Sequence, residues 1–154
     1  MEVKIINKGD IFICDNEELI YKMVRRTPIP FKTIGEIFQN EKKIAEVIFS
    51  VFYIKIIYQN FLYNVKIINQ KFFKVEFNVD GNVIRITHNP FFYFDKKKFS
   101  KIYFNSELTT IVSMKKILDI EGYNLELNFL KEDKLIKDVS IICFIIYCVE
   151  LNLS

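Results

Sequence analysis

Residues 139–149 read VSIICFIIYCV, and this stretch decides the fold of the chain. Ten of its eleven residues are apolar, and the exception, Ser140, carries only a small hydroxyl group. A helix that is apolar on all sides must be buried on all sides. A strand without alternating polar positions must be covered on both faces. Whichever element it forms, the rest of the chain has to enclose this segment.

The segment is too short to span a membrane. Eleven helical residues extend about 16 Å at ~1.5 Å per residue, whereas a bilayer core is ~30 Å thick and requires ~20 apolar residues. An extension to Leu153 brings in Glu150 and Asn152, which are costly in lipid. We therefore expect a buried core element rather than a tail anchor, and no transmembrane segment.

Residue preference and length disagree on whether the segment is a helix or a strand. Its Ile, Val, Phe and Tyr residues favour strands, and a uniformly apolar run has no periodicity that could decide. Its length favours a helix, because buried strands usually run ~4–8 residues. Asp138 could cap such a helix by accepting hydrogen bonds from free backbone N–H groups. We predict a helix that begins after Asp138, with a buried strand as the alternative.

Composition places the chain among globular proteins. It has 154 residues, of which 51% are hydrophobic, 16% aromatic and 27% charged, so we expect one domain over residues 1–154. The net charge of +3 is too small to predict a nucleic-acid partner. The three cysteines, Cys14, Cys143 and Cys148, show no zinc-ligand spacing. With no signal peptide evident in residues 1–16, we expect a reduced, cytoplasmic protein without metal or cofactor.

Short apolar stretches separated by polar turns fill the chain before residue 131. The predicted strands are 3–7, 10–15, 19–25, 35–39, 44–49, 51–58, 62–68, 74–79, 83–87, 91–94, 101–104 and 123–129. The clearest hairpin turn is Asp80-Gly81-Asn82, because Asp-Gly accepts the positive φ of a tight turn. Residues 27–30, with two prolines, are predicted to be a connection or an edge. Residues 110–114 and 117–120 form either a pair or one strand with Lys115-Lys116 facing solvent.

Ten to twelve short strands and one fully apolar segment together indicate a barrel. A sheet that curls into a barrel loses its edges, and a barrel of more than ~8 strands has an interior that its own side chains cannot fill. An apolar helix would fill that interior. We predict a mainly β antiparallel barrel or meander wrapped around a buried hydrophobic C-terminal helix.

Several segments, in this order, carry a resemblance to a known superfamily. They are 35–38 with 43–47, 79–83 before 87–90, 122–127, and the closing apolar segment. In pattern the chain resembles the tubby C-terminal-like superfamily, nearest its LURP-one-related branch, with phospholipid scramblases as more distant relatives. The resemblance covers most of residues 32–151 and implies a roughly twelve-stranded closed barrel around a hydrophobic C-terminal helix, which members end with an acidic step where Glu150 stands here.

The resemblance implies a lipid-related binding role rather than a reaction. Tubby proteins bind phosphoinositides and scramblases are associated with membranes. The chain has no match for the tubby-type basic pair or for the scramblase calcium segment. Its single histidine, His88, could be paired in principle with Cys14, but His88-Asn89-Pro90 is more typical of a turn after a strand. We expect no enzymatic activity.

One basic cluster stands out as a candidate lipid-binding site. Lys96, Lys97 and Lys98, with Lys101 nearby, are flanked by the aromatic residues Phe91, Phe92, Tyr93, Phe94 and Phe99. Lysines beside exposed aromatic rings can bind anionic headgroups. We therefore predict contact with anionic phospholipid or phosphoinositide through these four lysines. The alternatives are a plain polar hairpin tip and a structural or protein-interaction module with a protein partner.

Overall fold

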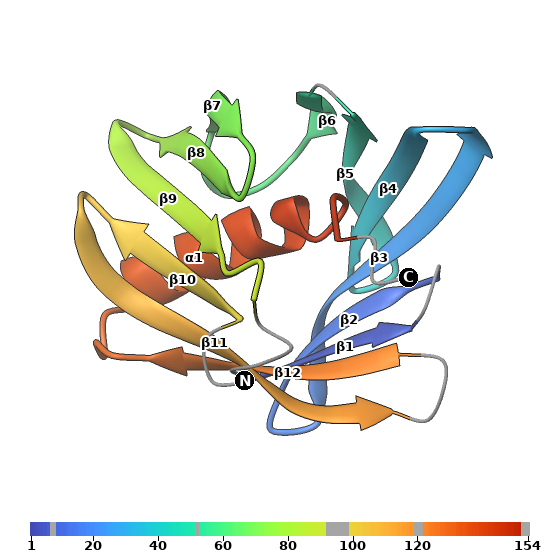
Figure 1. The fold of residues 1–154 in the computed structure, drawn as a ribbon. Coiled ribbons are helices and arrows are strands. Elements are labelled where there is room, and N and C mark those ends of the chain that lie inside the picture. The colour runs from blue at the N-terminus through green and yellow to red at the C-terminus, as the bar shows by residue number, and fades with distance from the viewer. Residues whose placement is uncertain (7–8, 52, 92–98, 119–121, 152–154) are drawn as a thin grey trace.

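Twelve strands followed by one helix make up the fold in the computed structural model, which describes residues 1–6, 9–51, 53–91, 99–118 and 122–151 (Figure 1). The strands are β1 (Glu2–Ile6), β2 (Ile11–Asp15), β3 (Glu18–Ile29), β4 (Lys32–Gln39), β5 (Lys42–Ser50), β6 (Tyr53–Gln59), β7 (Val65–Lys71), β8 (Lys74–Val79), β9 (Asn82–His88), β10 (Ser100–Phe104), β11 (Glu107–Leu118) and β12 (Gly122–Phe129), and the helix is α1 (Lys134–Tyr147).

The strands form a single antiparallel sheet that curls into a nearly closed barrel. Its order is β6-β5-β4-β3-β2-β1-β12-β11-β10-β9-β8-β7, so most strands pair with their chain neighbours, and β1 also pairs with β12. The two edge strands, β6 and β7, are consecutive in the chain but are not paired. The mainly β, twelve-stranded barrel predicted from the sequence is confirmed.

The sequence predicted a hairpin between β6 and β7, and this prediction is wrong, because these two edge strands do not pair and leave a seam in the barrel. The sequence indicated that 51–58 and 62–68 pair across a tight turn, yet side-chain amides bridge them instead. Gln59 Nε2 donates to Val65 O at 2.7 Å, Val65 N donates to Gln59 Oε1 at 2.9 Å, and Ile54 N donates to Gln70 Oε1. The connection of residues 60–64 is longer than a two-residue turn, so it does not hold the two strands at ladder distance.

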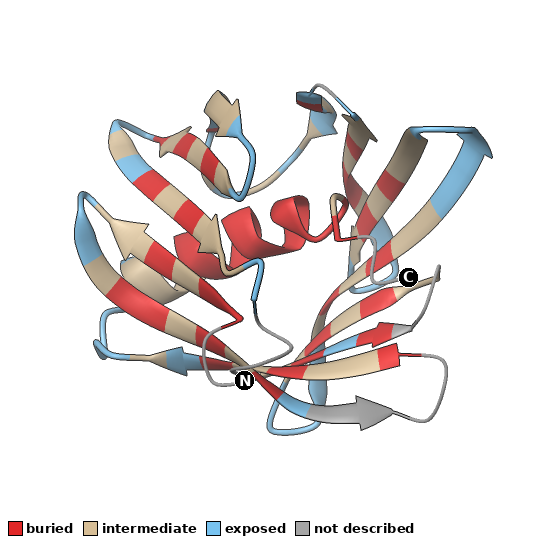
Figure 2. Cartoon of the chain, viewed as in Figure 1, coloured by how far each residue is buried: buried red, intermediate tan, exposed pale blue. Residues whose placement is uncertain are grey.

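Helix α1 occupies the interior of the barrel and contacts β8, β9 and β10 (Figures 1 and 2). Its residues 139–147 are all buried, which confirms the buried helix. The helix begins earlier than predicted, because Asp133 is the N-cap and its carboxylate accepts from Ile136 N at 3.0 Å. Asp138 lies inside the helix, where its carboxylate is 3.5 Å from the hydroxyl of Tyr63.

The wall of the barrel alternates as a half-buried sheet should. In β8 the side chains of Val75, Phe77 and Val79 are buried and those between them are partly exposed. Gly35 in β4 is needed where the wall meets the end of the helix. A Cβ at this position would lie 2.9 Å from Met23 Sδ and 3.1 Å from Val149 Cγ2.

Three further predictions about strands have different outcomes. Strand β3 continues through Pro28 to Ile29, with a register shift between Arg26 and Ile29, so the predicted connection at 27–30 begins only at Pro30. A register shift lets a strand accommodate residues that cannot donate to the ladder. Strand β11 runs unbroken to Leu118, which confirms the single-strand alternative. The predicted strand at 91–94 falls mostly outside the described residues.

We predict that Phe144→Ala lowers the free energy of unfolding by about 3–5 kcal/mol, because a large side chain is lost from a filled interior. Phe144 is fully buried in the last turn of α1. Urea unfolding measures the change, and Phe72→Ala at an exposed turn is the control with little expected effect. Similar midpoints for Phe144→Ala and the wild type would show that the helix does not fill the core.

We also predict that Cys143 and Cys148 resist thiol reagents until the protein unfolds. Both are fully buried, and burial strongly raises the pKa of both thiols, so neither forms the reactive thiolate. A colorimetric thiol reagent should label the partly exposed Cys14 in the native protein and two further thiols only in denaturant. Native labelling of two or three thiols at similar rates would contradict the enclosed helix.

Candidate binding site at one end of the barrel

The two ends of the barrel carry different turns. In an antiparallel meander, all turns from an odd to an even strand lie at one end, and those from an even to an odd strand lie at the other. The turn β3–β4 lies at the same end as the C-terminal end of α1, to the right in Figure 1. We call this the apolar end. The opposite end, which receives the start of α1 and the turns β8–β9 and β10–β11, is the polar end.

The tight turns of the polar end use residues that suit their backbone. Each has two consecutive residues with positive φ: Asn16 and Glu17, Asn40 and Glu41, Asp80 and Gly81, and Asn105 and Ser106. Asn, Asp and Gly adopt this left-handed conformation at low cost, so these are ordinary hairpin turns. Residues 60–64 depart from this pattern, because Leu62 is exposed there.

The turns of the apolar end place phenylalanine where Asn or Gly would be expected. Phe31 has φ +64° and Phe73 has φ +62°, and a bulky residue in this region is an outlier. The left-handed conformation costs such a residue ~1–2 kcal/mol. Phe31 is nevertheless 79% exposed and Phe72, beside Phe73, is 86% exposed. Phe31 and Phe72 thus bury little surface in the fold, whereas Phe73 is 42% exposed and packs on Phe72 and near His88. Exposed rings held at such a backbone cost mark a candidate contact site.

Exposed apolar side chains gather at this end in two groups. They are Ile29, Phe31, Val51 and Tyr53 on the turns β3–β4 and β5–β6, and Phe72, Phe73 and Phe91 on the turn β7–β8 and after β9. The second group is held together by ring contacts. Phe72 and Phe73 pack edge to face at 4.7 Å, and Phe73 lies 6.3 Å from the ring of His88. Clustered exposed apolar groups of this kind mark interaction sites.

Charge follows the same division between the ends. Within two residues of three turns at the apolar end, β3–β4, β5–β6 and β7–β8 (28–33, 49–54 and 70–75), the sequence has three lysines and no acid. The β1–β2 turn at the same end carries Asp10, and Lys74 pairs with Glu76 at 3.0 Å. Within two residues of the four polar-end turns, in 14–19, 38–43, 78–83 and 103–108, it has six acids and two lysines. These three turns of the apolar end are therefore more basic than the four tight turns of the polar end.

Of the four lysines predicted from the sequence, the structure places only Lys101. It lies in β10 opposite Thr87 and Ile111, partly exposed on the outer face between the buried Ser100 and Ile102. Lys96, Lys97 and Lys98 lie outside the described residues.

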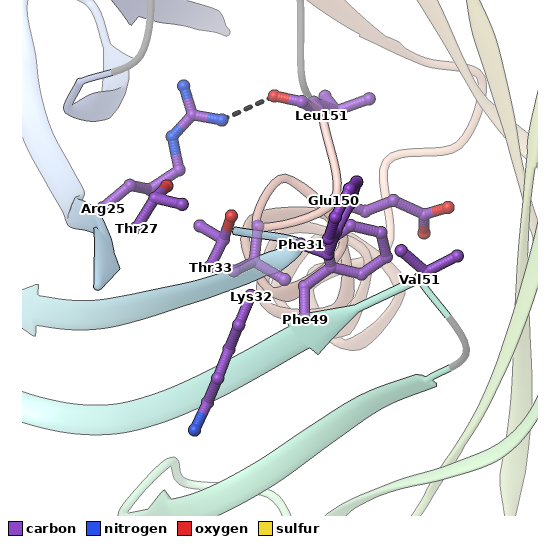
Figure 3. A pocket seen from close by; sticks show the side chains of 10 residues that line it. Arg25, Thr27, Phe31, Lys32, Thr33, Phe49, Val51, Glu150 and Leu151 are labelled. Carbon is purple, nitrogen blue, oxygen red and sulfur yellow. Dashed lines mark hydrogen bonds between the residues drawn. The ribbon is translucent and has the colours of Figure 1, made fainter. Parts of the chain in front are cut away.

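A pocket of about 640 Å³ opens beside Phe31 at the apolar end (Figure 3). Its lining comprises Arg25, Thr27, Phe31, Lys32, Thr33, Phe49, Val51, Val149, Glu150 and Leu151. Glu150 directly follows the helical turn that ends α1, and its Oε2 atom is buried without a hydrogen-bond partner. Burial raises the pKa of Glu150 to about 7. The carboxyl group is therefore close to half ionised at neutral pH.

Arg25, which lines this pocket, is hydrogen-bonded to the residues that follow the helix. Its Nη1 donates to Leu151 O at 2.5 Å and its Nε donates to Gly9 O at 2.8 Å. Burial lowers the pKa of Arg25, since its guanidinium is largely removed from water. These bonds hold the last described residues of the chain against β3, so that Glu150 is positioned by the tertiary structure.

The Cys-His pair considered from the sequence does not form. Cys14 lies in β2 and His88 in β9, with four strands between them in the sheet. His88 packs edge to face on Phe99 at 4.9 Å, and burial lowers the pKa of its imidazole. Within the part of the chain that the structure describes, no group of three or more His, Cys, Asp or Glu side chains could hold a metal ion.

Sequence reasoning missed both the turn phenylalanines and Glu150. The first had a signal, since Pro30-Phe31 and Phe72-Phe73 stand in turns where Asn or Gly is usual. The resemblance marked Glu150 as an acidic step after the helix, but its place in a pocket had no signal, because the pocket combines side chains from β3 to β5 with the distant end of the chain. No protein family model, curated protein or solved structure matches this chain. No helix among the described residues is long and apolar enough to cross a membrane.

We predict that the stability difference between wild type and Glu150→Gln depends on pH. Because the folded pKa of Glu150 is raised from 4.5 to about 7, its neutral form stabilises the fold below pH 4.5, and this contribution is lost as the pH rises through 7. Between pH 5 and 8 the wild type should lose about 1–2 kcal/mol relative to the variant, after allowance for partial exposure. Urea unfolding at both pH values measures this, and a constant difference would contradict the burial of the carboxyl group.

Proposed function

We propose that this barrel is a non-enzymatic module that rests its apolar end on an anionic membrane surface. The observation that carries the proposal is the shared location of exposed phenylalanines and lysines at one end, opposite an end rich in carboxylates. Aromatic rings enter the headgroup boundary while lysines attract anionic lipid. The acidic polar end would be repelled, so the charge distribution favours one orientation.

The energies are sufficient for reversible binding. An apolar side chain contributes ~1.5–3 kcal/mol when it is fully removed from water, and rings at an interface gain part of this. Each lysine near an anionic surface adds ~1 kcal/mol, attenuated beyond a Debye length. Two or three inserted phenylalanines with Lys32, Lys71 and Lys74 would therefore hold the barrel at the membrane, and salt would weaken the binding. Lys96, Lys97 and Lys98 would add to this charge.

The fold supports the resemblance found in the sequence. A twelve-stranded antiparallel barrel around one C-terminal helix is the architecture that the resemblance to tubby C-terminal-like proteins implies. We propose that the chain is a divergent member of that superfamily, near the LURP-one-related branch. Phosphoinositides are therefore included among the anionic lipids to be tested. The free cysteines fit the cytoplasmic location that we propose.

A protein-interaction module is the second candidate, favoured by the seam of the barrel. Strands β6 and β7 have no ladder partner on their facing edges, and Tyr53, Ile57, Tyr58 and Ile68 are exposed along them. An extended peptide can add to such an edge through main-chain hydrogen bonds. The apolar turns lie at an end of the barrel, whereas this seam runs along its wall, so the two candidates predict different contact residues.

We predict that the protein sediments with vesicles that contain phosphatidylglycerol or a phosphoinositide, and not with phosphatidylcholine vesicles, at low salt. Phe31→Asn combined with Phe73→Asn should weaken this binding at least about tenfold, which corresponds to 1.4 kcal/mol. Asn adopts positive φ more readily than Phe, so the double variant should be at least as stable as the wild type. Lys96→Glu, Lys97→Glu and Lys98→Glu together should also weaken binding.

Leu62→Asn is the matched control, because Leu62 is equally exposed at the polar end. It should sediment as the wild type does. Failure of the wild type to sediment at low salt, or equal sedimentation of the double phenylalanine variant, would overturn the membrane proposal. The protein-interaction candidate would then take its place.

A further inference from the structure

The pocket beside Glu150 is lined both by a carboxylate without a hydrogen-bond partner and by aromatic rings. Glu150 is the only acid among the ten described residues that line it, and its Oε2 atom is buried and accepts no hydrogen bond. Figure 3 shows the rings of Phe31 and Phe49 between the guanidinium of Arg25 on one side and the carboxylate of Glu150 on the other. A buried acceptor without a donor is costly, so a ligand that supplies one would gain binding energy.

An organic ammonium group fits this arrangement better than a metal ion. A divalent cation needs several oxygen ligands, usually with more than one carboxylate, and the lining has one. An ammonium group is satisfied by one carboxylate together with aromatic faces, which attract cations electrostatically. Phe31 and Phe49 provide such faces near Glu150.

The cation that lines the same pocket decides what the ammonium is attached to. Arg25 would repel a bare amine, yet it would attract an anionic group on the same ligand, whereas the amine of Lys32 points away from the pocket (Figure 3). A ligand with an ammonium at one end and a phosphate at the other places opposite charges against both sides of the pocket. Phospholipid headgroups of the phosphoethanolamine and phosphocholine type have this distribution of charge.

We propose that this pocket binds the zwitterionic headgroup of a phospholipid, with its ammonium group against Glu150, Phe31 and Phe49 and its phosphate toward Arg25. The identification of the ligand as a lipid rests on the proposed function. Phe31 and Val51 line the pocket and also belong to the exposed apolar group of the same end. A headgroup can therefore enter while its acyl chains remain in the bilayer. The volume of about 640 Å³ lies within the usual range for small-molecule sites.

The ionisation of Glu150 gives the site a pH dependence. The titratable groups around it are Arg25 from β3, which lines the same pocket, Tyr147 at the end of the helix, which interacts with Glu150, and Cys148, which interacts with Arg25; Lys32 from β4 points away, and Phe49 and Val51 from β5 are uncharged. Burial raises the pKa of both Tyr147 and Cys148, so neither ionises near neutrality. With the pKa of Glu150 at about 7, the ionised fraction rises about tenfold from pH 6 to pH 8. Headgroup affinity should rise by up to the same factor.

The test titrates the full-length protein with soluble glycerophosphoethanolamine and glycerophosphocholine by isothermal titration calorimetry. We expect saturable binding that is stronger at pH 8 than at pH 6, and weaker binding of ethanolamine or glycerol phosphate alone. Glu150→Gln should weaken headgroup binding at least about tenfold, corresponding to 1.4 kcal/mol, and remove its pH dependence. Leu62→Asn at the opposite end should bind as the wild type does. Absence of saturable binding, or equal affinity of Glu150→Gln, would overturn the proposal.

Two vesicle experiments separate this site from the membrane-binding function and identify the source of the headgroup. Glu150→Gln should still sediment with phosphatidylglycerol vesicles, whereas Phe73→Asn, which does not line the pocket, should lose vesicle binding and keep soluble headgroup binding. Vesicles containing phosphatidylethanolamine should displace the soluble headgroup from the wild type. If the soluble compound binds and such vesicles do not displace it, the ligand is a free phosphodiester and the assignment to lipid fails.

Discussion

The structure depends on the burial of α1 inside the barrel. Nine consecutive side chains of this helix, residues 139–147, are buried, and residues this apolar have no stable place in water. The sheet has a matching requirement, because a barrel of twelve strands encloses more space than its inward side chains can fill. Helix and sheet therefore stabilise each other, and neither is expected to persist alone. Two local features hold them together at the apolar end: the bonds of Arg25 to Gly9 and Leu151, and the close contact of Val149 with Gly35.

Because α1 fills the interior of the barrel, binding surfaces lie at its ends and at the seam between β6 and β7. The polar end has turns whose residues suit positive φ, whereas the apolar end holds Phe31 and Phe73 in the same conformation at a cost in free energy. Because Phe31 is largely exposed, the folded chain does not recover that cost internally there. The helix adds a second feature to the same end, since its last residues bring Glu150 beside Phe31 and Phe49. Exposed rings and a partly enclosed carboxyl group thus share one face of the molecule.

Much of the fold could be predicted from local patterns. Alternation in 74–79 and 123–129 predicted half-buried strands, and Asp80-Gly81 predicted a tight turn, because each pattern reflects interactions within a few residues. Local patterns failed where a distant contact decided the outcome. The helix begins at Lys134 rather than after Asp138, since the carboxylate of Asp133 caps it by accepting from Ile136 N. Strands β6 and β7 do not pair, although both were expected as strands, and Gln59 and Gln70 bridge them through side chains.

The amino-acid sequence by itself determined that residues 139–149 are buried and that the surrounding chain forms short antiparallel strands. These properties follow from side-chain chemistry and from preferences that act over a few positions. Only the tertiary structure decided which turns share an end, where the barrel has its seam, and that Glu150 lies beside the tip of β3–β4. That contact joins residues more than a hundred positions apart, and its position depends on how far the helix reaches through the barrel.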